Sequence, residues 1–199
     1  MNSINVKIVG VGGQGVVSAG IILGEAASKR NVNVVMSEIH GMAQRGGIVS
    51  VDIRFGDIYG PISPDNNIDL LIGFEILETI RAFKYTNDKT FILMNNEKII
   101  PFTSNLLKIG YPNVENYTKD RKGRFLVIDA VEIANRVGTY KAVNTVMIGA
   151  ATALGILPVN NEDVEEAIKG ILPKSFWDIN IKAFRMGIEA TNALRAAYL

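Results

Sequence analysis

Two glycine-rich segments hold the residues whose types and spacing could do chemistry. Residues 10–15 read G-V-G-G-Q-G and fit the pattern G-x-G-x-x-G between an apolar run and a helix-like segment. Glycines there allow a tight turn and let an anion approach the backbone N–H groups at a helix N-terminus. Binding of an anionic ligand is one interpretation, and a close strand-to-helix turn without a ligand is the other. The ligand- or interface-binding candidates in this segment are Gly10, Gly12, Gly13, Gln14 and Gly15.

The second segment, residues 37–47, reads S-E-I-H-G-M-A-Q-R-G-G. It has neither helical nor strand periodicity, and its three glycines predict an irregular loop, where functional groups often concentrate. Arg45 stands beside two glycines and could present its guanidinium to a carboxylate or phosphate, or serve as an ion-pair or interface residue. A lone histidine is more often structural than catalytic, so we assign no catalytic residue. The candidates here are Glu38, His40, Gln44, Arg45, Gly46 and Gly47.

A dinucleotide site would also need an acidic residue at the end of the second strand to hold the ribose hydroxyls. Glu38 is the candidate for that role, but it lies a few residues beyond the usual offset and opens the predicted loop. This spacing weakens an interpretation as an NAD site.

The composition limits the number of domains, the kinds of partner and the kinds of metal site that are possible. The chain has 199 residues, of which 48% are hydrophobic, and we expect one domain over residues 1–199. The formal net charge of +1 does not favour nucleic acid as a partner. The sequence has no cysteine and one histidine, which excludes disulfides, thiolate-bound zinc and an iron–sulfur cluster ligated from within this chain. We therefore expect no metal site here.

The N-terminus lacks the features of a signal peptide, so we expect a cytoplasmic protein. The longest apolar stretch, residues 142–157, is interrupted by Asn144 and Thr145 and is shorter than the roughly 20 residues that span a bilayer. We expect a buried helix there and no membrane contact.

Short β-branched runs alternate with helix-like segments along the first two thirds of the chain. This alternation predicts a three-layer α/β/α fold, with a Rossmann-like, mostly parallel sheet and a helical C-terminal third. We expect the first two strands to pair in parallel as a right-handed βαβ unit. The expected strands are 4–9, 32–36, 49–55, 68–73, 90–94 and 125–128, and the expected helices are 16–26, 74–83, 131–136, 140–154, 164–169 and 180–197.

Three further patterns give local expectations. Residues 49–55 alternate apolar and polar side chains, which predicts a strand with one wet or partner-facing side. Glu75 and Glu78 lie three apart, and we interpret them as an exposed helix flank without a catalytic role. The small residues in 149–153 predict close approach of another backbone, from the sheet or from a partner.

The two segments together resemble the gamma-type domain of the pyruvate and 2-oxoacid:ferredoxin oxidoreductases. Residues 9–15 and the Arg45-Gly46-Gly47 sequence match that superfamily broadly, and the H-G-M-A-Q sequence of residues 40–44 resembles its indolepyruvate oxidoreductase beta-subunit branch. Further likeness follows at residues 73–75, 144–145 and 180–184. The resemblance spans nearly the whole chain.

The resemblance implies a subunit for the oxidative decarboxylation of an aryl-pyruvate by coenzyme A and oxidised ferredoxin. The products are an acyl thioester, CO₂ and reduced ferredoxin. Thiamine diphosphate and the [4Fe-4S] clusters would belong to a large alpha subunit, so this chain would bind no cofactor alone and be inactive alone. Use of ferredoxin implies an anaerobic setting. The glycine loop and Arg45 would suit the phosphates of coenzyme A or the substrate carboxylate, without a choice between them.

Two other functions stay open at this point. The first is an independent NAD(P)- or FAD-binding module built on the same glycine loop. The second is a purely architectural subunit whose two loops support the partner and contact no ligand.

Overall fold

The computed structural model describes residues 3–41, 47–100, 111–119 and 124–198 of the chain. Six strands form one sheet in the order β2-β3-β1-β4-β5-β6. Their bounds are β1 Ile4–Val11, β2 Val34–His40, β3 Ile48–Phe55, β4 Leu70–Gly73, β5 Phe91–Asn95 and β6 Phe125–Ile128. Every strand that we expected from the sequence is present.

The sheet is mostly parallel, as predicted. Strands β1, β4, β5 and β6 pair in parallel, whereas β3 runs antiparallel to both of its neighbours, β1 and β2. The expected direct pairing of the first two strands is therefore wrong, because β3 lies between them. The reason is visible in burial: β3 is apolar enough to lie inside the sheet, whereas β2 is half-buried to exposed and forms the edge.

Strand β2 also extends further than predicted. Residues 37–40 continue β2 instead of opening an irregular loop, and they pair with residues 49–52 of β3. The backbone N–H of Gly41 then donates to the Ile48 carbonyl oxygen over 2.8 Å. Strand pairing with β3, which the single sequence does not reveal, overrides the local glycine signal.

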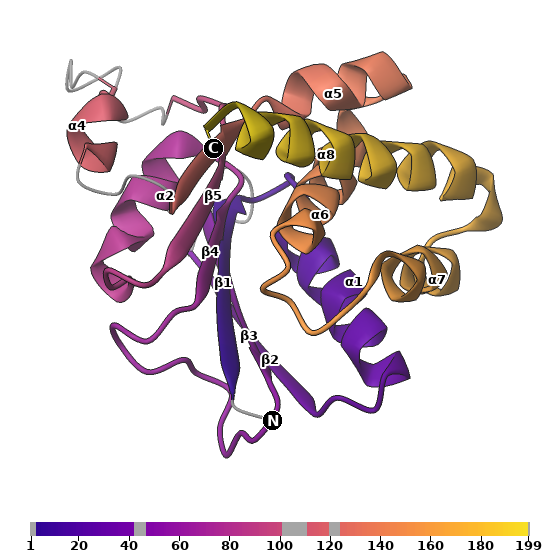
Figure 1. Ribbon diagram of the computed structural model, residues 1–199, viewed down its shortest axis with the longest axis horizontal. Helices are drawn as coiled ribbons and strands as arrows, with labels where there is room; N and C mark the ends of the chain where they lie inside the picture. Colours follow the sequence, from indigo (N-terminus) through magenta and orange to yellow (C-terminus); the bar gives the residue numbers. More distant parts are fainter. Residues whose placement is uncertain (1–2, 42–46, 101–110, 120–123, 199) are drawn as a thin grey trace.

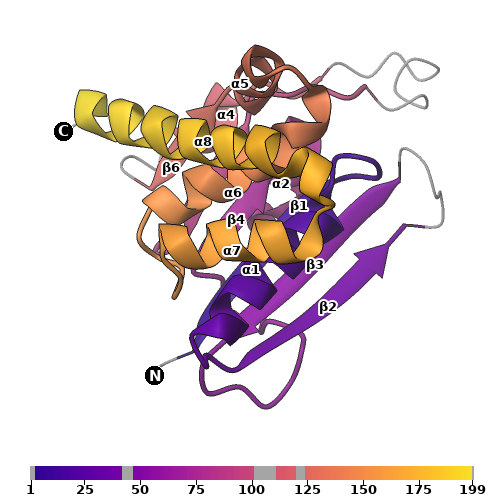
Figure 2. The ribbon, with the colours of Figure 1, turned by 90° about the vertical axis from the view of Figure 1, so that its right-hand side faces the viewer.

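Helices cover both faces of the sheet. Figure 1 shows α2 on one face and α1, α6 and α8 on the other, and Figure 2 shows α1, α6, α7 and α8 crossing the second face. This is the predicted three-layer fold with a helical C-terminal third. The α-helices are α1 Val16–Lys29, α2 Ile76–Ala82, α4 Glu115–Thr118, α5 Ala130–Val137, α6 Val143–Ala153, α7 Asn161–Ile171 and α8 Trp177–Tyr198, and the 3-10 turns are η1 Phe83–Tyr85, η2 Tyr140–Ala142 and η3 Lys174–Phe176.

The main core lies between the sheet and the helices α1, α6 and α8. Val6 and Ile8 of β1 and Ile53 of β3 are fully buried there, and a smaller cluster around Val9 and Leu71 lies under α2. Because side chains alternate along a strand, β1 supplies both clusters. Within the described ranges, no helix is both long and apolar enough to cross a membrane.

At Gly149, one of the small residues of α6, the backbone that approaches closely is that of α8, and not that of the sheet or a partner as predicted. A methyl group added at Gly149 would overlap the carbonyl oxygen of Phe184, and one added at Gly187 would overlap the carbonyl oxygen of Val146. The two helix backbones therefore touch at both glycines. This packing fixes α6, whose first turn lies beside the glycine loop.

Candidate functional site

The glycine loop connects the end of β1 to the start of α1. Gly13 and Gly15 have φ values of 105° and 82°, in the left-handed region that favours glycine. A Cβ at Gly10 would lie within 3 Å of the side chains of Gln14, Val16 and Phe74. Gly10, Gly13 and Gly15 are thus required by the turn or by packing, whether or not a ligand binds.

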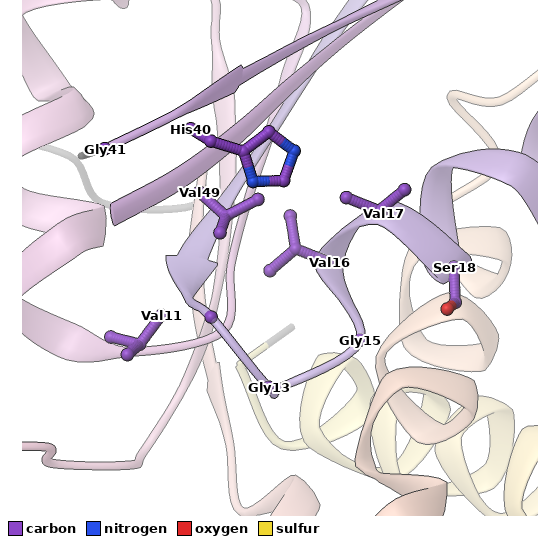
Figure 3. A pocket seen from close by; sticks show the side chains of 10 residues that line it. Val11, Gly13, Gly15, Val16, Val17, Ser18, His40, Gly41 and Val49 are labelled. Carbon is purple, nitrogen blue, oxygen red and sulfur yellow. The ribbon is translucent and has the colours of Figure 1, made fainter. Parts of the chain in front are cut away.

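The two predicted segments lie side by side at the carboxyl ends of β1 and β2. The backbone N–H of Gly12 donates to the Gly47 carbonyl oxygen over 2.9 Å. An open pocket of about 680 Å³ lies between the segments, and Figure 3 shows the His40 ring pointing toward the start of α1. The pocket is lined by Val11, Gly12, Gly13, Gly15, Val16, Val17, Ser18, His40, Gly41 and Val49.

The pocket combines apolar sides with the N-terminal end of α1. The N-cap residue Gly15 offers no side chain to the first N–H groups, and the first turn carries no acidic residue. The partial positive charge of this 14-residue helix is therefore not offset by a carboxylate of its own first turn. Val16, Val17 and Val49 supply the apolar surface. Such a pocket suits an anionic group joined to an apolar body.

Glu38 and His40 form a pair on the exposed end of β2. Glu38 Oε2 and His40 Nε2 are 3.1 Å apart, and 55% of the His40 side chain is exposed. In a dinucleotide site the acid follows the strand beside β1, but β3 occupies that place here. The position of Glu38 on the edge strand therefore argues against the dinucleotide-binding alternative.

The other candidate residues of the two segments occupy different positions relative to the pocket. Gln14 is buried, and its side chain makes hydrogen bonds behind the loop; it is absent from the pocket lining. Gly47 lies against the glycine loop through its bond to Gly12. Gln44, Arg45 and Gly46 fall outside the described residues.

Glu75 and Glu78 are buried, so the expectation of an exposed helix flank is wrong. Glu75 caps α2 by accepting from the Glu78 N–H over 2.9 Å, and Glu78 pairs with Arg81 over 2.7 Å. Burial is the main cause that raises the pKa of both carboxyls, and the Glu75 charge raises that of Glu78 further. The segment that follows β5 covers this capping turn, since the Ile99 N–H donates to Glu75 Oε1 over 3.2 Å.

Glu97 and Tyr140 were missed by sequence reasoning. The Tyr140 hydroxyl donates to Glu97 Oε1 over 2.8 Å, and burial together with that carboxylate raises the pKa of Tyr140 to about 12. Tyr140 therefore keeps its proton as a donor. Glu97 follows β5 in a stretch without periodicity, and Tyr140 is 43 residues away, so no local pattern links them.

The donor set of this chain does not fit an iron–sulfur cluster, because the sequence lacks cysteine. Across the part of the chain that the structure covers, no three His, Asp or Glu side chains gather in a way that could hold a metal ion. The described pocket can bind and orient an organic anion, but it supplies no redox centre.

Comparison with known proteins shows the family of the chain. Residues 5–190 match the family of pyruvate ferredoxin/flavodoxin oxidoreductases. The chain is 41% identical to the indolepyruvate oxidoreductase subunit IorB of Methanothermobacter thermautotrophicus, over 94% of this chain and 96% of that one. It is 36% identical to the IorB subunit of Archaeoglobus fulgidus, over 92% and 93% of the two chains.

A solved structure has the same fold. The gamma subunit of a keto/oxoacid ferredoxin oxidoreductase from Geobacter sulfurreducens superposes with a TM-score of 0.69 at 27% identity, covering 96% of this chain and 99% of that one. The match therefore covers nearly the whole length of both chains. This chain belongs to the pyruvate ferredoxin/flavodoxin oxidoreductase family.

Proposed function

We propose that this chain is the small subunit of an indolepyruvate (aryl-pyruvate):ferredoxin oxidoreductase. The observation that carries the proposal is its 41% identity, over nearly the full length, to a subunit of an indolepyruvate oxidoreductase. Residues 1–199 would act as one gamma-type domain of the complex. The absence of cysteine supports placing the iron–sulfur clusters in another chain.

In this proposal a large subunit carries thiamine diphosphate and the [4Fe-4S] clusters and passes electrons to ferredoxin. The thiamine cofactor would supply the carbon–carbon bond cleavage, and coenzyme A would take the acyl group. The small subunit would bind and orient a reactant without joining the electron transfer. A cytosolic location belongs to the proposal as well, and cell fractionation tests it.

The described pocket would hold an anionic part of coenzyme A or of the 2-oxoacid. The start of α1 and the glycine loop offer backbone N–H groups to a phosphate or carboxylate, and the valines offer contact to an apolar part. Arg45 is proposed as an added anion ligand on the strength of its residue type and sequence position. No residue of this chain is assigned a catalytic role.

Reconstitution tests the proposal. The chain is expected to show no oxidoreductase activity by itself, and the pair with its large subunit to reduce ferredoxin only with both indolepyruvate and coenzyme A. Iron and thiamine diphosphate are expected to co-purify with the large subunit. Full activity of the large subunit alone would contradict the proposal.

A variant separates ligand binding from a purely architectural role. In the reconstituted complex, Ser18→Asp places a carboxylate in the first turn of α1, at the pocket, where it competes with a bound anion. An increased KM for coenzyme A or for indolepyruvate identifies the reactant at the pocket. If neither KM changes while the complex still assembles, the architectural function replaces the proposed one.

A further inference from the structure

Gln14 fixes the shape of the glycine loop from behind the pocket. Its Oε1 accepts from the Val11 N–H over 2.7 Å, and its Nε2 donates to the Phe74 carbonyl oxygen over 3.0 Å. The same Nε2 donates to Glu97 Oε2 over 2.9 Å. Only 6% of Gln14 is exposed, so this amide has little access to water as a substitute partner.

Three donors from separate parts of the chain converge on the carboxylate of Glu97. Besides Gln14, the Asn95 side chain donates to Oε2 over 3.2 Å, and the Tyr140 hydroxyl donates to Oε1 over 2.8 Å. Hydrogen bonds to a charged acceptor are stronger than those between neutral groups. Glu97 thus joins the glycine loop to the end of β5 and to the turn that precedes α6.

Hydrogen bonds that do not involve the Glu97 side chain hold the backbone around this residue. The Ile76 N–H donates to the Glu97 carbonyl oxygen over 3.0 Å, and the Ile99 N–H donates to Glu75 Oε1 over 3.2 Å. The segment after β5 is therefore held against the start of α2 by two bonds. Changing only the Glu97 side chain leaves both bonds in place, so its effect on the glycine loop can be measured separately.

We propose that Glu97 is a positioning residue that acts through Gln14 on the glycine loop, and thereby sets the affinity of the pocket for its anionic ligand. Glu97 does not line the pocket, so its influence passes through the Gln14 amide to Val11 and the turn behind it. The inference deepens the proposed function and rests on it for the identity of the ligand.

The first test compares two variants of Glu97 in the reconstituted complex. Glu97→Ala leaves the Gln14 Nε2 without this acceptor, and the KM for the reactant at the pocket is expected to rise about tenfold with kcat within about twofold. Glu97→Gln keeps one acceptor oxygen for Gln14, while the Tyr140 hydroxyl can rotate to accept from the new amide. It is expected to restore most of the wild-type KM.

The second test exchanges donor and acceptor. In Gln14→Glu the new side chain still accepts from the Val11 N–H, but it places a second carboxylate next to that of Glu97. The KM of this variant for the reactant at the pocket is therefore expected to rise at least as much as that of Glu97→Ala. Adding Glu97→Gln to Gln14→Glu supplies an N–H toward the new carboxylate, and the KM of the double variant is expected to fall below that of Gln14→Glu. Glu132→Gln, which changes an exposed carboxylate paired with Arg136, is the matched control.

Hydrogen exchange of the peptide covering residues 10–15 gives a readout that needs no ligand. Exchange in the full-length chain is expected to be faster in Glu97→Ala and Gln14→Glu, and slower again in the double variant than in Gln14→Glu. If the variants lower only the melting temperature, with both KM values and loop exchange as in Glu132→Gln, the inference is overturned. If Ser18→Asp also leaves both KM values unchanged, the proposed ligand function fails, and the exchange pattern alone decides whether Glu97 positions the loop.

Discussion

The Gly12 N–H and the Gly47 carbonyl oxygen are joined by a 2.9 Å hydrogen bond between two segments that lie 35 positions apart in the sequence. Gly12 belongs to the turn between β1 and α1, and Gly47 directly precedes β3. The bond ties the glycine loop, which lines the pocket, to the chain that enters β3. The shape of the pocket therefore depends on both segments together.

Replacing Gly13 by alanine tests the conformation of this turn. The φ of 105° is unfavourable for any residue with a Cβ, although no atom lies within 4 Å of the position that a Cβ would take. Gly13→Ala is expected to lower the free energy of unfolding by about 1–2 kcal/mol through backbone strain alone. Gly60→Ala is the control, since that site has equal space and no positive φ. Equal chemical denaturation curves for the two variants would contradict the argument.

Close packing of α6 on α8 leads to a second prediction. Gly149→Ala places a methyl group against the Phe184 carbonyl oxygen, a backbone atom that cannot move without shifting α8. We expect a loss of about 3 kcal/mol or more, which is a large share of the total stability of about 5–15 kcal/mol that is usual for a folded domain. Gly170→Ala in α7 meets no neighbour and is expected to stabilise the chain by about 0.5–1 kcal/mol. Thermal melting followed by circular dichroism distinguishes the two directions.

Much of the fold could be predicted because the local sequence patterns agree with the burial of the same residues in the structure. The run 125–128 is an apolar strand in the sequence and in the structure, and Asp129 caps the next helix by accepting from the Glu132 N–H over 2.9 Å. The glycine loop was found from its spacing alone. The segment around Gly47 lies beside it because β1 and β2 run in the same direction and end at one edge of the sheet.

The order of strands and the buried polar groups could not be predicted in this way. Pairing of β3 with β1 depends on competition among all strands for neighbours, which no short window of sequence contains. The alternation of Asp52 with apolar residues predicts a solvent-facing side of the strand. Asp52 is nevertheless buried, because it forms an ion pair with Lys7 of the adjacent strand. The contact between Glu97 and Tyr140 could not be predicted for the same reason, because the two residues are 43 positions apart in the sequence.

The ion pair of Lys7 and Asp52 gives a third prediction. Their charged atoms are 2.7 Å apart, both side chains are more than nine-tenths buried, and the Lys7 ammonium lies 4.6 Å from the centre of the Tyr85 ring. Asp52→Asn leaves a buried ammonium without its counter-charge, which is expected to cost about 3–5 kcal/mol. The double variant Lys7→Met with Asp52→Val is expected to be more stable than Asp52→Asn, because neither charge remains.

Equilibrium denaturation of the single and double variants measures this coupling. Glu132→Gln, which removes one charge of the exposed pair with Arg136, is the control and is expected to change the stability little. If Asp52→Asn were as stable as this control, the pair would contribute nothing to the fold.

The buried carboxyls of Glu75 and Glu78 predict how stability changes with pH. Their pKa values in the folded chain lie above the ordinary 4.5, so between 4.5 and those raised values the folded chain binds more protons than the unfolded chain. The stability that they contribute is full below about pH 4.5 and decreases as the pH rises through the raised pKa values. The double variant Glu75→Gln with Glu78→Gln is therefore expected to lose less stability than the wild type between pH 4.5 and 7, as measured by urea denaturation.

A single variant measures how much the charge of Glu75 raises the pKa of Glu78. The charge of Glu75 is one cause of the raised pKa of Glu78, so Glu75→Gln is expected to lower the pKa of Glu78 without returning it to 4.5, since burial remains the larger cause. Carbon-13 NMR titration of the glutamate side-chain carboxyls follows this change directly. Glu132→Gln on α5 is the matched control, and an unchanged pKa of Glu78 in Glu75→Gln would show that burial and not the neighbouring charge sets it.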